Sequence, residues 1–365
     1  MPSSFSPASF EIACSTGGYD IHIGNELLDR ELGGAGERLV IADRFLAGTL
    51  AARGIDAILI TADEHAKSLD RMGDLIESIK DRQATRNTTL IAIGGGVVQD
   101  CVTFVASVYM RGVPWIYIPT TLLSMVDSCI GGKSSINVGR YKNIVGTFHP
   151  PRRVVIDPAL AQSLSTEQRI AGLSEAVKIC MCRGPEAFDA YLALRPSPTM
   201  DETGFAAVTE LCLRAKKWFI EIDEFDRKER LILNFGHTFG HAIEAASGFA
   251  IGHGVAVGLG MLAALNLGET LGHAPFSDPR VTTFRDHIHG LLASVDGLVA
   301  HLAACDLDKL MDAFGADKKH GREELAVILV NRAGAVHRIM LPRSEEMLKQ
   351  VANAFSSLKS IPFAR

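Results

Sequence analysis

The chain lacks the features that would direct it to a nucleic acid or into a membrane. Its 365 residues include 37 lysines and arginines against 42 aspartates and glutamates, so the formal net charge at pH 7 is -5. A chain without excess positive charge is not drawn to a nucleic-acid backbone or to an anionic membrane surface. No uninterrupted apolar run reaches the roughly 20 residues that a membrane-spanning helix requires. We therefore expect neither partner, and a local cluster of basic residues is expected to bind a small anion.

A disulfide framework and an export signal are also missing. The seven cysteines are scattered and odd in number, and Cys180 and Cys182 lack the Cys-x-x-Cys spacing of a redox or zinc-binding pair. Residues 1–7 offer neither the basic nor the apolar stretch of a secretory signal peptide. Reduced thiols in the cytoplasm are the simplest explanation of the cysteine usage. We expect a soluble cytoplasmic enzyme.

The chain does have enough apolar content for two packed domains. Apolar residues make up 47% and charged residues 22% of the sequence, as is typical of globular proteins of this length. In residues 1–158, short apolar stretches such as 39–43 alternate with amphipathic stretches such as 68–82. This alternation, with strands buried on both faces, predicts an α/β domain with a Rossmann-like parallel sheet.

Three consecutive glycines, Gly94, Gly95 and Gly96, lie between a predicted strand at 88–93 and a predicted helix at 98–110. Open α/β sheets bind ligands at the carboxyl ends of their strands, where glycine lets the main chain approach a phosphate. The spacing is not Gly-x-Gly-x-x-Gly, so a tight turn explains these glycines about as well as a dinucleotide site does. Asp43, which ends an earlier predicted strand, would either accept a ribose hydroxyl or cap the following helix.

Charged residues gather in the segment that follows. Arg111, Asp127, Lys133, Lys142 and Asn143 are interleaved with glycines and apolar residues. Because an unpaired charge is costly to desolvate, Asp127 and Lys133 in such surroundings indicate a functional site rather than a solvated surface.

Beyond residue 158 the pattern becomes helical, which predicts a mainly α-helical domain over residues 159–365. Helices are predicted at 166–183, with Ser165 as N-cap, at 205–225 and at 255–271. A hairpin at 324–341 and a helix at 344–358 are predicted to end the chain.

The histidines of this second domain indicate a metal centre. His237 and His241 are one helical turn apart and share one face of a helix, and His253 follows where the next helix is predicted to begin. Glu175 lies one turn before Lys178 on the helix predicted at 166–183. One carboxylate and two imidazoles form a typical catalytic zinc set that leaves positions open for substrate. Histidines at this spacing also arise by chance, so the metal interpretation depends on the rest of the chain.

With these residues in place, the sequence resembles the dehydroquinate synthases and related sugar phosphate cyclases over nearly its whole length. The resemblance implies a fold with an NAD-binding α/β domain and a helical metal-binding domain. It also implies conversion of 3-deoxy-arabino-heptulosonate 7-phosphate to 3-dehydroquinate and phosphate, through transient oxidation by NAD, β-elimination, reduction and an intramolecular aldol step. The matching motifs are Gly94-Gly-Gly-Val-Val-Gln-Asp100, Tyr109-Met-Arg-Gly112, Pro119-Thr-Thr-Leu-Leu-Ser-Met-Val-Asp-Ser128, Gly131-Gly-Lys133, Lys142-Asn143, Ser174-Glu-Ala-Val-Lys178, Leu233-Asn-Phe-Gly-His-Thr-Phe-Gly-His-Ala-Ile-Glu244, Gly252-His-Gly254 and Asp317-Lys-Lys319.

The resemblance further implies roles for individual residues. Zinc or cobalt would bind Glu175, His237 and His253, and Arg111 would reach the phosphate site of the neighbouring subunit in a homodimer. Phosphate would be bound by His241, Lys133, Asn143 and one of two lysines, Lys318 or Lys319; substrate hydroxyls by Asp127, Lys178 and Asn234, with Lys142 close by; and a substrate carboxylate by Lys216 and Arg230. NAD would be bound by Asp43, Glu64, Lys67, Gly94, Gly95, Gly96, Val97, Asp100, Thr120 and Thr121.

Some positions depart from the family pattern and leave the substrate open. Gln99 replaces a usual glycine, and residues 103–104, 148–151 and 164–168 also differ. A cyclase of secondary metabolism, acting on an amino analogue or a heptulose 7-phosphate, is one alternative, although His241, Lys216 and Arg230 favour a substrate with a carboxylate. From another class, a metal-dependent NAD alcohol or glycerol dehydrogenase shares the two-domain plan but needs no phosphate-binding residues.

Overall fold

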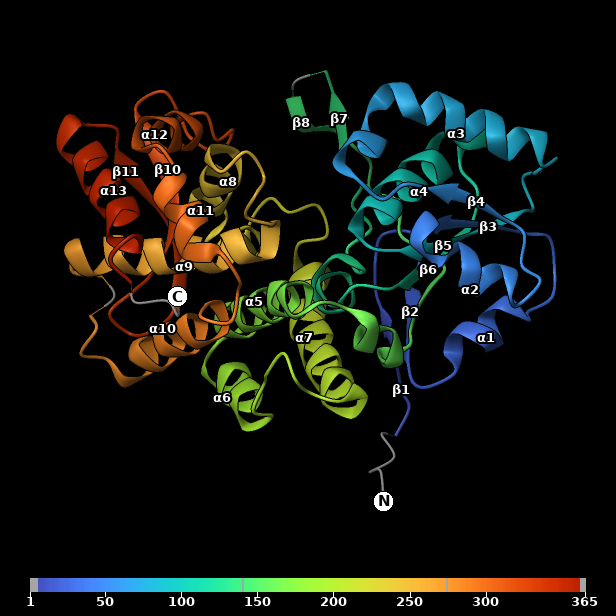
Figure 1. Ribbon diagram of the computed structural model, residues 1–365, viewed down its shortest axis with the longest axis horizontal. Helices are drawn as coiled ribbons and strands as arrows, with labels where there is room; N and C mark the ends of the chain where they lie inside the picture. Colours follow the sequence, from blue (N-terminus) through green and yellow to red (C-terminus); the bar gives the residue numbers. More distant parts are fainter. Residues whose placement is uncertain (1–5, 140, 274, 362–365) are drawn as a thin grey trace. The chain divides into compact units, whose positions relative to one another are not determined.

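The computed structural model describes residues 6–139, 141–273 and 275–361, and their contacts divide the chain into two compact units (Figure 1). The first unit contains residues 1–164 and 201–225, and the second contains residues 165–200 and 226–365. The sequence placed one boundary near residue 158 and assigned everything beyond it to the second domain. In the structure the segment 201–225 instead packs with the first unit.

The first unit is built on a seven-stranded sheet, which confirms the predicted Rossmann-like architecture. The edge strand β1 (Ala8–Ile12) runs antiparallel to β2, whereas the remaining neighbours in the sheet are parallel. The strand order is β1, β2 (Tyr19–Ile23), β9 (Arg153–Ile156), β6 (Trp115–Pro119), β5 (Thr89–Gly94), β3 (Arg38–Asp43) and β4 (Ala57–Ile60).

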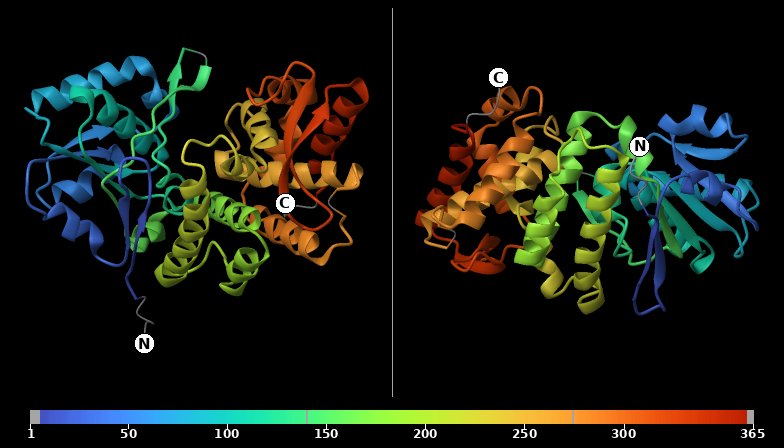
Figure 2. Two further views of the ribbon diagram at one scale, coloured as in Figure 1. Left: turned by 180° about the vertical axis from the view of Figure 1, so that it is seen from behind. Right: turned by 90° about the horizontal axis from the view of Figure 1, so that it is seen from below.

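Helices cover both faces of this sheet because its central strands are apolar on both sides (Figures 1 and 2). On one face, α1 (Leu27–Leu32) and α2 (Ala47–Ala51) pack against a core that includes Ile91 and Ile118. On the other face lie α3 (Leu69–Asp81) and α4 (Gly96–Val108), which contact each other. The central strands β3, β5 and β6 are buried almost continuously, so their side chains pack into a hydrophobic layer on each face of the sheet.

Helix α7 (Glu202–Ile222) belongs to the first unit because polar contacts attach it to the β1 end of the sheet. Glu221 accepts a hydrogen bond from the main-chain nitrogen of Ala13 at 2.9 Å, and Lys217 donates to the main-chain oxygen of Glu11 at 2.8 Å. The carboxylate of Glu224, just beyond α7, binds the main chain and the hydroxyl of Ser15. No periodicity along the sequence indicates such a long-range attachment.

Two short features of the first unit were not predicted. A ribbon of two strands, β7 (Ile136–Val138) and β8 (Tyr141–Val145), lies near the α3 and α4 side of the sheet (Figure 1). A turn of π-helix, η4 (Ser124–Ser128), follows β6. Short helical turns of 3₁₀ type occur at η1 (Arg44–Leu46), η2 (Glu64–Lys67), η3 (Tyr109–Arg111) and η5 (Pro158–Ser163).

The second unit is mainly helical, as predicted, and is arranged around the buried helix α9 (His253–Thr270), which contacts α5, α8, α10 and α13 (Figure 1). Helix α5 covers Thr166–Arg183, and Ser165 caps it in a reciprocal arrangement with Gln168. The remaining elements are α6 (Pro185–Ala193), η6 (Glu229–Asn234), α8 (His237–Ala246), α10 (Pro279–Leu292), α11 (Leu298–Ala304), α12 (Leu307–Gly315), the hairpin of β10 (Glu324–Val330) and β11 (Val336–Pro342), and α13 (Glu345–Leu358).

Glycines let α9 approach its neighbours through main-chain atoms. A methyl group on Gly260 would lie 2.0 Å from the main-chain oxygen of Gly236, and one on Gly254 would lie 2.4 Å from the main-chain oxygen of Ala171. Larger residues at these positions would force α8 and α5 away from α9. The three helices that carry the expected metal ligands are therefore held close together by the absence of side chains.

Among the residues described, no helix combines the length and the apolar character needed to cross a bilayer.

Candidate metal and phosphate site

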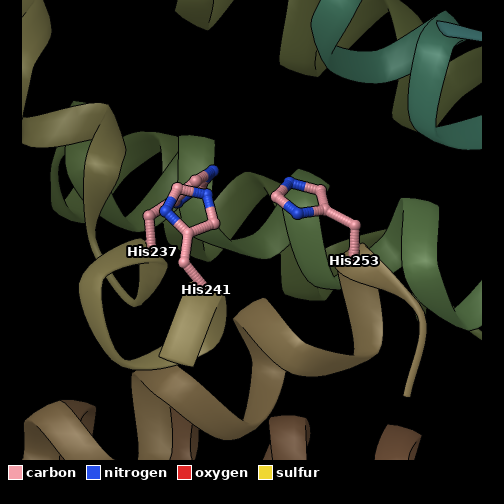
Figure 3. A group of neighbouring side chains, drawn as sticks. All are labelled: His237, His241 and His253. Atoms are coloured by element: carbon pink, nitrogen blue, oxygen red, sulfur yellow. The ribbon is translucent and has the colours of Figure 1, made fainter. Parts of the chain in front are cut away.

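Three histidines converge where α8 meets the first turn of α9 (Figure 3). His237 and His241 lie one turn apart on α8, and His253 is the first residue of α9, as the sequence predicted. One ring nitrogen from each histidine lies within 4.8 Å of those of the other two. Such spacing is compatible with ligands that surround a single cation.

Glu175 of α5 completes this group from a buried position, with 1% of its side chain exposed. Its Oε1 atom lies 3.7 Å from Nε2 of His237 and 3.5 Å from Nε2 of His253. The close contact of Gly254 with α5 explains why a residue so distant in sequence reaches the histidines. The structure thus brings together the three predicted metal ligands.

Each of these three side chains is also held on the side that faces away from the group. Lys178 donates a hydrogen bond to Oε2 of Glu175. Nδ1 of His253 lies 3.0 Å from a carboxylate oxygen of Glu244, and Nδ1 of His237 lies 3.3 Å from the main-chain oxygen of Phe235. Outer partners of this kind orient metal ligands in proteins. The donor set and its supports therefore fit a divalent metal such as zinc.

The pKa values of the histidines are also compatible with a bound cation. Burial, together with the charge of Lys178, holds the pKa of His237 well below its usual range. Burial also opposes protonation of His253, but hydrogen bonds and charges from Glu175 and Glu244 outweigh it and raise the pKa of His253 to about 10. The carboxylates of Glu175 and Glu244 thus favour a positive charge at His253, which a proton or a metal ion would supply.

His241 differs from the three predicted ligands in its surroundings. Its ring forms no hydrogen bond with any residue that the structure describes, and it contacts the rings of His237 and His253 at centroid distances of 5.4 and 5.7 Å. The side chain of His241 is exposed, but partial desolvation of its ring and the charge of Lys319 lower the pKa of His241 to about 4. A ring without a partner beside a lysine suits the predicted binding of an anion.

Lys319, rather than Lys318, is the lysine of the Asp317 motif that lies near the histidines. Its charge acts on the pKa of both His237 and His241, and its ammonium pairs with Asp317 at 3.1 Å. Lys318 is exposed. The sequence alone did not distinguish the two lysines.

Two other predicted substrate residues lie on η6 of the same unit. Arg230 is buried, and Asn234 donates a hydrogen bond to the main-chain oxygen of Leu231 at 3.0 Å. Lys178, which is predicted to bind a substrate hydroxyl, donates a hydrogen bond to Glu175.

In the first unit, the glycine turn joins β5 to α4 under close packing. A methyl group on Gly94 would lie 2.6 Å from the side chain of Val98, and one on Gly95 would lie 3.0 Å from that of Thr121. No side chain caps the N-terminus of α4, which begins at Gly96. Free main-chain N–H groups at the start of a helix, approached over glycine, suit the diphosphate of a dinucleotide.

Predicted cofactor and substrate residues meet at Lys67, which is buried. Its ammonium pairs with Asp100 at 2.8 Å and donates a hydrogen bond to the side chain of Asn143 at 3.3 Å. Glu64 lies 3.9 Å from Lys67 and 3.6 Å from Lys142. Burial raises the pKa of Asp100 to about 6, although the charge of Lys67 works against this increase. Residues predicted to bind NAD and residues predicted to bind substrate therefore belong to one network of charged and polar contacts around Lys67.

Asp127 and Lys216, for which different roles were predicted, form a second ion pair. Lys216 of α7 donates to the carboxylate of Asp127, to its main-chain oxygen at 2.6 Å and to that of Ile130 at 3.5 Å. The lysine that was expected to bind a substrate carboxylate thus contacts the η4 turn.

Three further predicted residues of the first unit are Lys133, Asp43 and Arg111. Lys133 follows Gly132, whose backbone is left-handed with φ +61° and leaves no space for a methyl group beside Pro150. Asp43 accepts a hydrogen bond from the nitrogen of Phe45, so it caps η1. Arg111 is exposed, has a left-handed backbone with φ 69°, and forms no hydrogen bond or ion pair with another described residue.

The sequence missed residues whose contacts depend on the tertiary structure. Gln99, noted only as a departure from a pattern, donates to the main-chain oxygen of Ser128 and accepts from its hydroxyl, each at 2.6 Å. Asn137 binds Glu64 at 2.8 Å. Glu244 is the last residue of the motif at 233–244, but only the structure shows that its carboxylate contacts His253.

The fold is shared with a class of enzymes of solved structure that includes sugar phosphate cyclases and glycerol dehydrogenases. A crystal structure of 2-deoxy-scyllo-inosose synthase complexed with carbaglucose-6-phosphate, NAD+ and Co2+ is 23% identical, with 94% of this chain and 99% of that chain covered and a TM-score of 0.82. ValA (2-epi-5-epi-valiolone synthase) from Streptomyces hygroscopicus, with NAD+ and Zn2+ bound, is also 23% identical, at coverages of 95% and 98% and a TM-score of 0.78. A probable glycerol dehydrogenase from Sinorhizobium meliloti, 15% identical at coverages of 93% and 95%, has a TM-score of 0.60.

The sequence comparisons identify the family within this class. Residues 57–171 match the model for the N-terminal part of 3-dehydroquinate synthase, and residues 172–320 match the model for its C-terminal part. The 3-dehydroquinate synthase of Rhodospirillum rubrum is 37% identical over 342 residues, or 87% of each chain. That of Alkaliphilus metalliredigens is 34% identical over 341 residues, or 90% of this chain and 94% of the relative. The chain belongs to the 3-dehydroquinate synthase family.

Proposed function

We propose that the protein converts 3-deoxy-arabino-heptulosonate 7-phosphate to 3-dehydroquinate and phosphate, as a carbon–oxygen lyase that uses NAD and a divalent metal. The observation that carries the proposal lies within the second unit. Oε1 of Glu175 faces Nε2 of His237 and His253 at 3.7 and 3.5 Å, and beside these atoms His241 and Lys319 offer donors to an anion. A dehydrogenase that oxidises a simple alcohol has no use for that anion site.

Glu175, His237 and His253 would hold the metal, zinc or cobalt, and the glycine turn with Asp100, Thr120 and Thr121 would bind NAD. When bound, these groups would acidify substrate hydroxyls and would accept and return a hydride, so that the net reaction is not an oxidation. Glu64, Lys67 and Asp43 complete the proposed cofactor set.

The remaining residues of the chain would bind and orient the substrate. His241 and Lys319 would donate hydrogen bonds to its phosphate, with Lys133 and Asn143 as further donors, and Arg230 would pair with its carboxylate. Asp127 and Asn234 would hold its hydroxyls. Several fixed contacts on one flexible molecule restrict it to a reactive pose, which is the entropic part of the catalysis.

We also propose a homodimer in which Arg111 completes the phosphate site of the neighbouring subunit. An exposed arginine in a left-handed conformation, with no partner among the described residues, supports this proposal. The cysteines are free thiols, which fits the reducing conditions of the cytoplasm that we propose as its location.

One assay tests the main proposal. Purified protein with zinc, a catalytic amount of NAD and the heptulosonate phosphate is expected to release phosphate and form dehydroquinate without lasting NADH absorbance. Turnover of sedoheptulose 7-phosphate, with no phosphate release from the heptulosonate, would assign the protein to the cyclases of secondary metabolism. Net formation of NADH from glycerol or another alcohol would assign it to the dehydrogenases.

A further inference from the structure

Glu244 lies on α8, one turn beyond His241, and its carboxylate reaches across to the first residue of α9. Its Oε2 atom is 3.0 Å from Nδ1 of His253. Glu244 is one of two carboxylates that contact this ring, and the other is Glu175, at 3.5 Å from Nε2. The two contacts lie on opposite nitrogens of one imidazole.

This arrangement decides which nitrogen of His253 is available to a metal. A neutral imidazole carries one proton and one lone pair on its two nitrogens. A carboxylate at Nδ1 accepts a hydrogen bond, so the proton is retained there and the lone pair of Nε2 is directed toward Glu175. Without the carboxylate, the ring could place its proton on either nitrogen.

His253 depends on this contact more than the other imidazole does. The matching support of His237 is the main-chain oxygen of Phe235, which no substitution removes. His253 is also the more exposed ring, with 38% of its side chain accessible against 14% for His237. Packing alone therefore restrains the His253 ring less, and a specific hydrogen bond has more influence on its orientation.

We propose that Glu244 is a positioning residue of the metal centre, which orients His253 and selects its Nε2 lone pair for the metal. The inference rests on the metal that is part of the proposed function. It assigns Glu244 no contact with substrate and no place among the ligands.

Zinc affinity, measured by competition with a chromophoric chelator in the absence of substrate, tests this role directly. Glu244→Ala is expected to weaken zinc binding about 10- to 100-fold, as is usual when the outer partner of a metal-binding histidine is lost. Glu244→Gln keeps an oxygen that accepts from Nδ1 but loses the charge, so its affinity should fall between those of Glu244→Ala and the wild type. Glu269→Gln is the matched control, because that carboxylate accepts a hydrogen bond from the nitrogen of Phe276 on the same unit, and its zinc affinity should not change.

A second readout separates positioning from general damage to the fold. The visible spectrum of the Co2+-loaded Glu244 variants should shift relative to wild type, while far-ultraviolet circular dichroism remains the same. If Glu244→Ala does not fold, Glu244→Gln carries the test by itself. Zinc affinity of folded Glu244→Ala within about twofold of wild type, or an affinity of Glu244→Gln equal to that of wild type, would overturn the inference, since loss of an outer partner typically costs about 10- to 100-fold. Failure of the wild-type protein to bind zinc would instead overturn the proposed function and this inference together.

Discussion

The ammonium of Lys216 lies 2.6 Å from the main-chain oxygen of Asp127 and also binds the carboxylate of the same residue. Lys216 also donates to the main-chain oxygen of Ile130, two residues beyond the η4 turn, at 3.5 Å. Lys216 therefore links α7 to the segment that carries Asp127. In this structure Lys216 compensates the charge of the Asp127 carboxylate and restrains its position.

Replacing Lys216 by methionine should consequently destabilise the protein. Both side chains of the pair are largely buried, so Asp127 would lose its partner in a place of low solvent access. We expect a loss of about 3 kcal/mol in the free energy of unfolding, the lower end of the range for a broken buried pair. Urea denaturation measures it. Lys217→Met, which breaks the more exposed pair with Glu221, should cost less than about 1 kcal/mol, and equal losses in the two variants would contradict the assignment.

His253→Ala should abolish tight zinc binding, because Glu175 and His237 would remain as the only two predicted ligands. The metal content after dialysis, measured by atomic emission, should fall to background. Zinc should also no longer raise the melting temperature, since a ligand that does not bind does not stabilise. His301→Ala, which removes an exposed histidine of α11, serves as control. Unchanged zinc content in His253→Ala would reject the ligand assignment.

His241→Asn separates two possible uses of the third histidine. Inorganic phosphate should inhibit the variant about 10- to 100-fold more weakly than wild type, because a hydrogen bond to a charged group contributes about 1.5–3 kcal/mol. Zinc content should stay the same. Lys319→Met should behave alike, whereas Lys318→Met is expected to have a small effect. Loss of zinc from His241→Asn would place this histidine among the metal ligands.

The affinity for NAD should decrease as the pH falls from 7 to 5. Burial raises the pKa of Asp100 to about 6, so the carboxylate takes up a proton in this range and its ion pair with Lys67 is lost. Titration calorimetry at several pH values measures the dissociation constant, which should rise with a midpoint near that pKa. Asp100→Asn should remove this pH dependence. A variant with the same pH profile as wild type would show that another group is responsible.

Arg111→Ala tests the shared phosphate site. The variant should remain a dimer in light scattering but show a raised KM for the phosphorylated substrate. Mixed dimers of Arg111→Ala and His253→Ala should recover activity, because one of the two sites then has both an intact metal centre and an intact neighbouring arginine. No recovery in verified mixed dimers would place Arg111 within its own subunit's site.

The sequence predicted those elements whose position depends on residues close together in the chain. The Ser165 cap and the apolar face of α5 predict its bounds as observed, Thr166–Arg183. The helix predicted at 255–271 corresponds to α9, which begins two residues earlier, at His253. The buried strands and the glycine turn follow from equally local patterns. These signals depend on main-chain geometry within a few residues.

Contacts between distant segments could not be predicted in this way. The hydrophobic face of α7 does not indicate which unit it joins, because its attachment depends on Glu221, Lys217 and the β1 end of the sheet. The contact of Glu244 with His253 requires the packing of two helices. Gln99 looked like a departure from a pattern until its hydrogen bonds with Ser128 were seen.

The contact between α8 and α9 has a consequence for the size of the ion that the proposed metal centre would accept. Because Gly236 and Gly260 meet through main-chain atoms, the spacing of the imidazoles is fixed by the backbone and not by the rings themselves. One added methyl group at Gly260 would push α8 away from α9 and so increase the distance between His237 and His253, although neither histidine is replaced. Selectivity between ions of different radius would then be adjusted by a residue that never touches the ion.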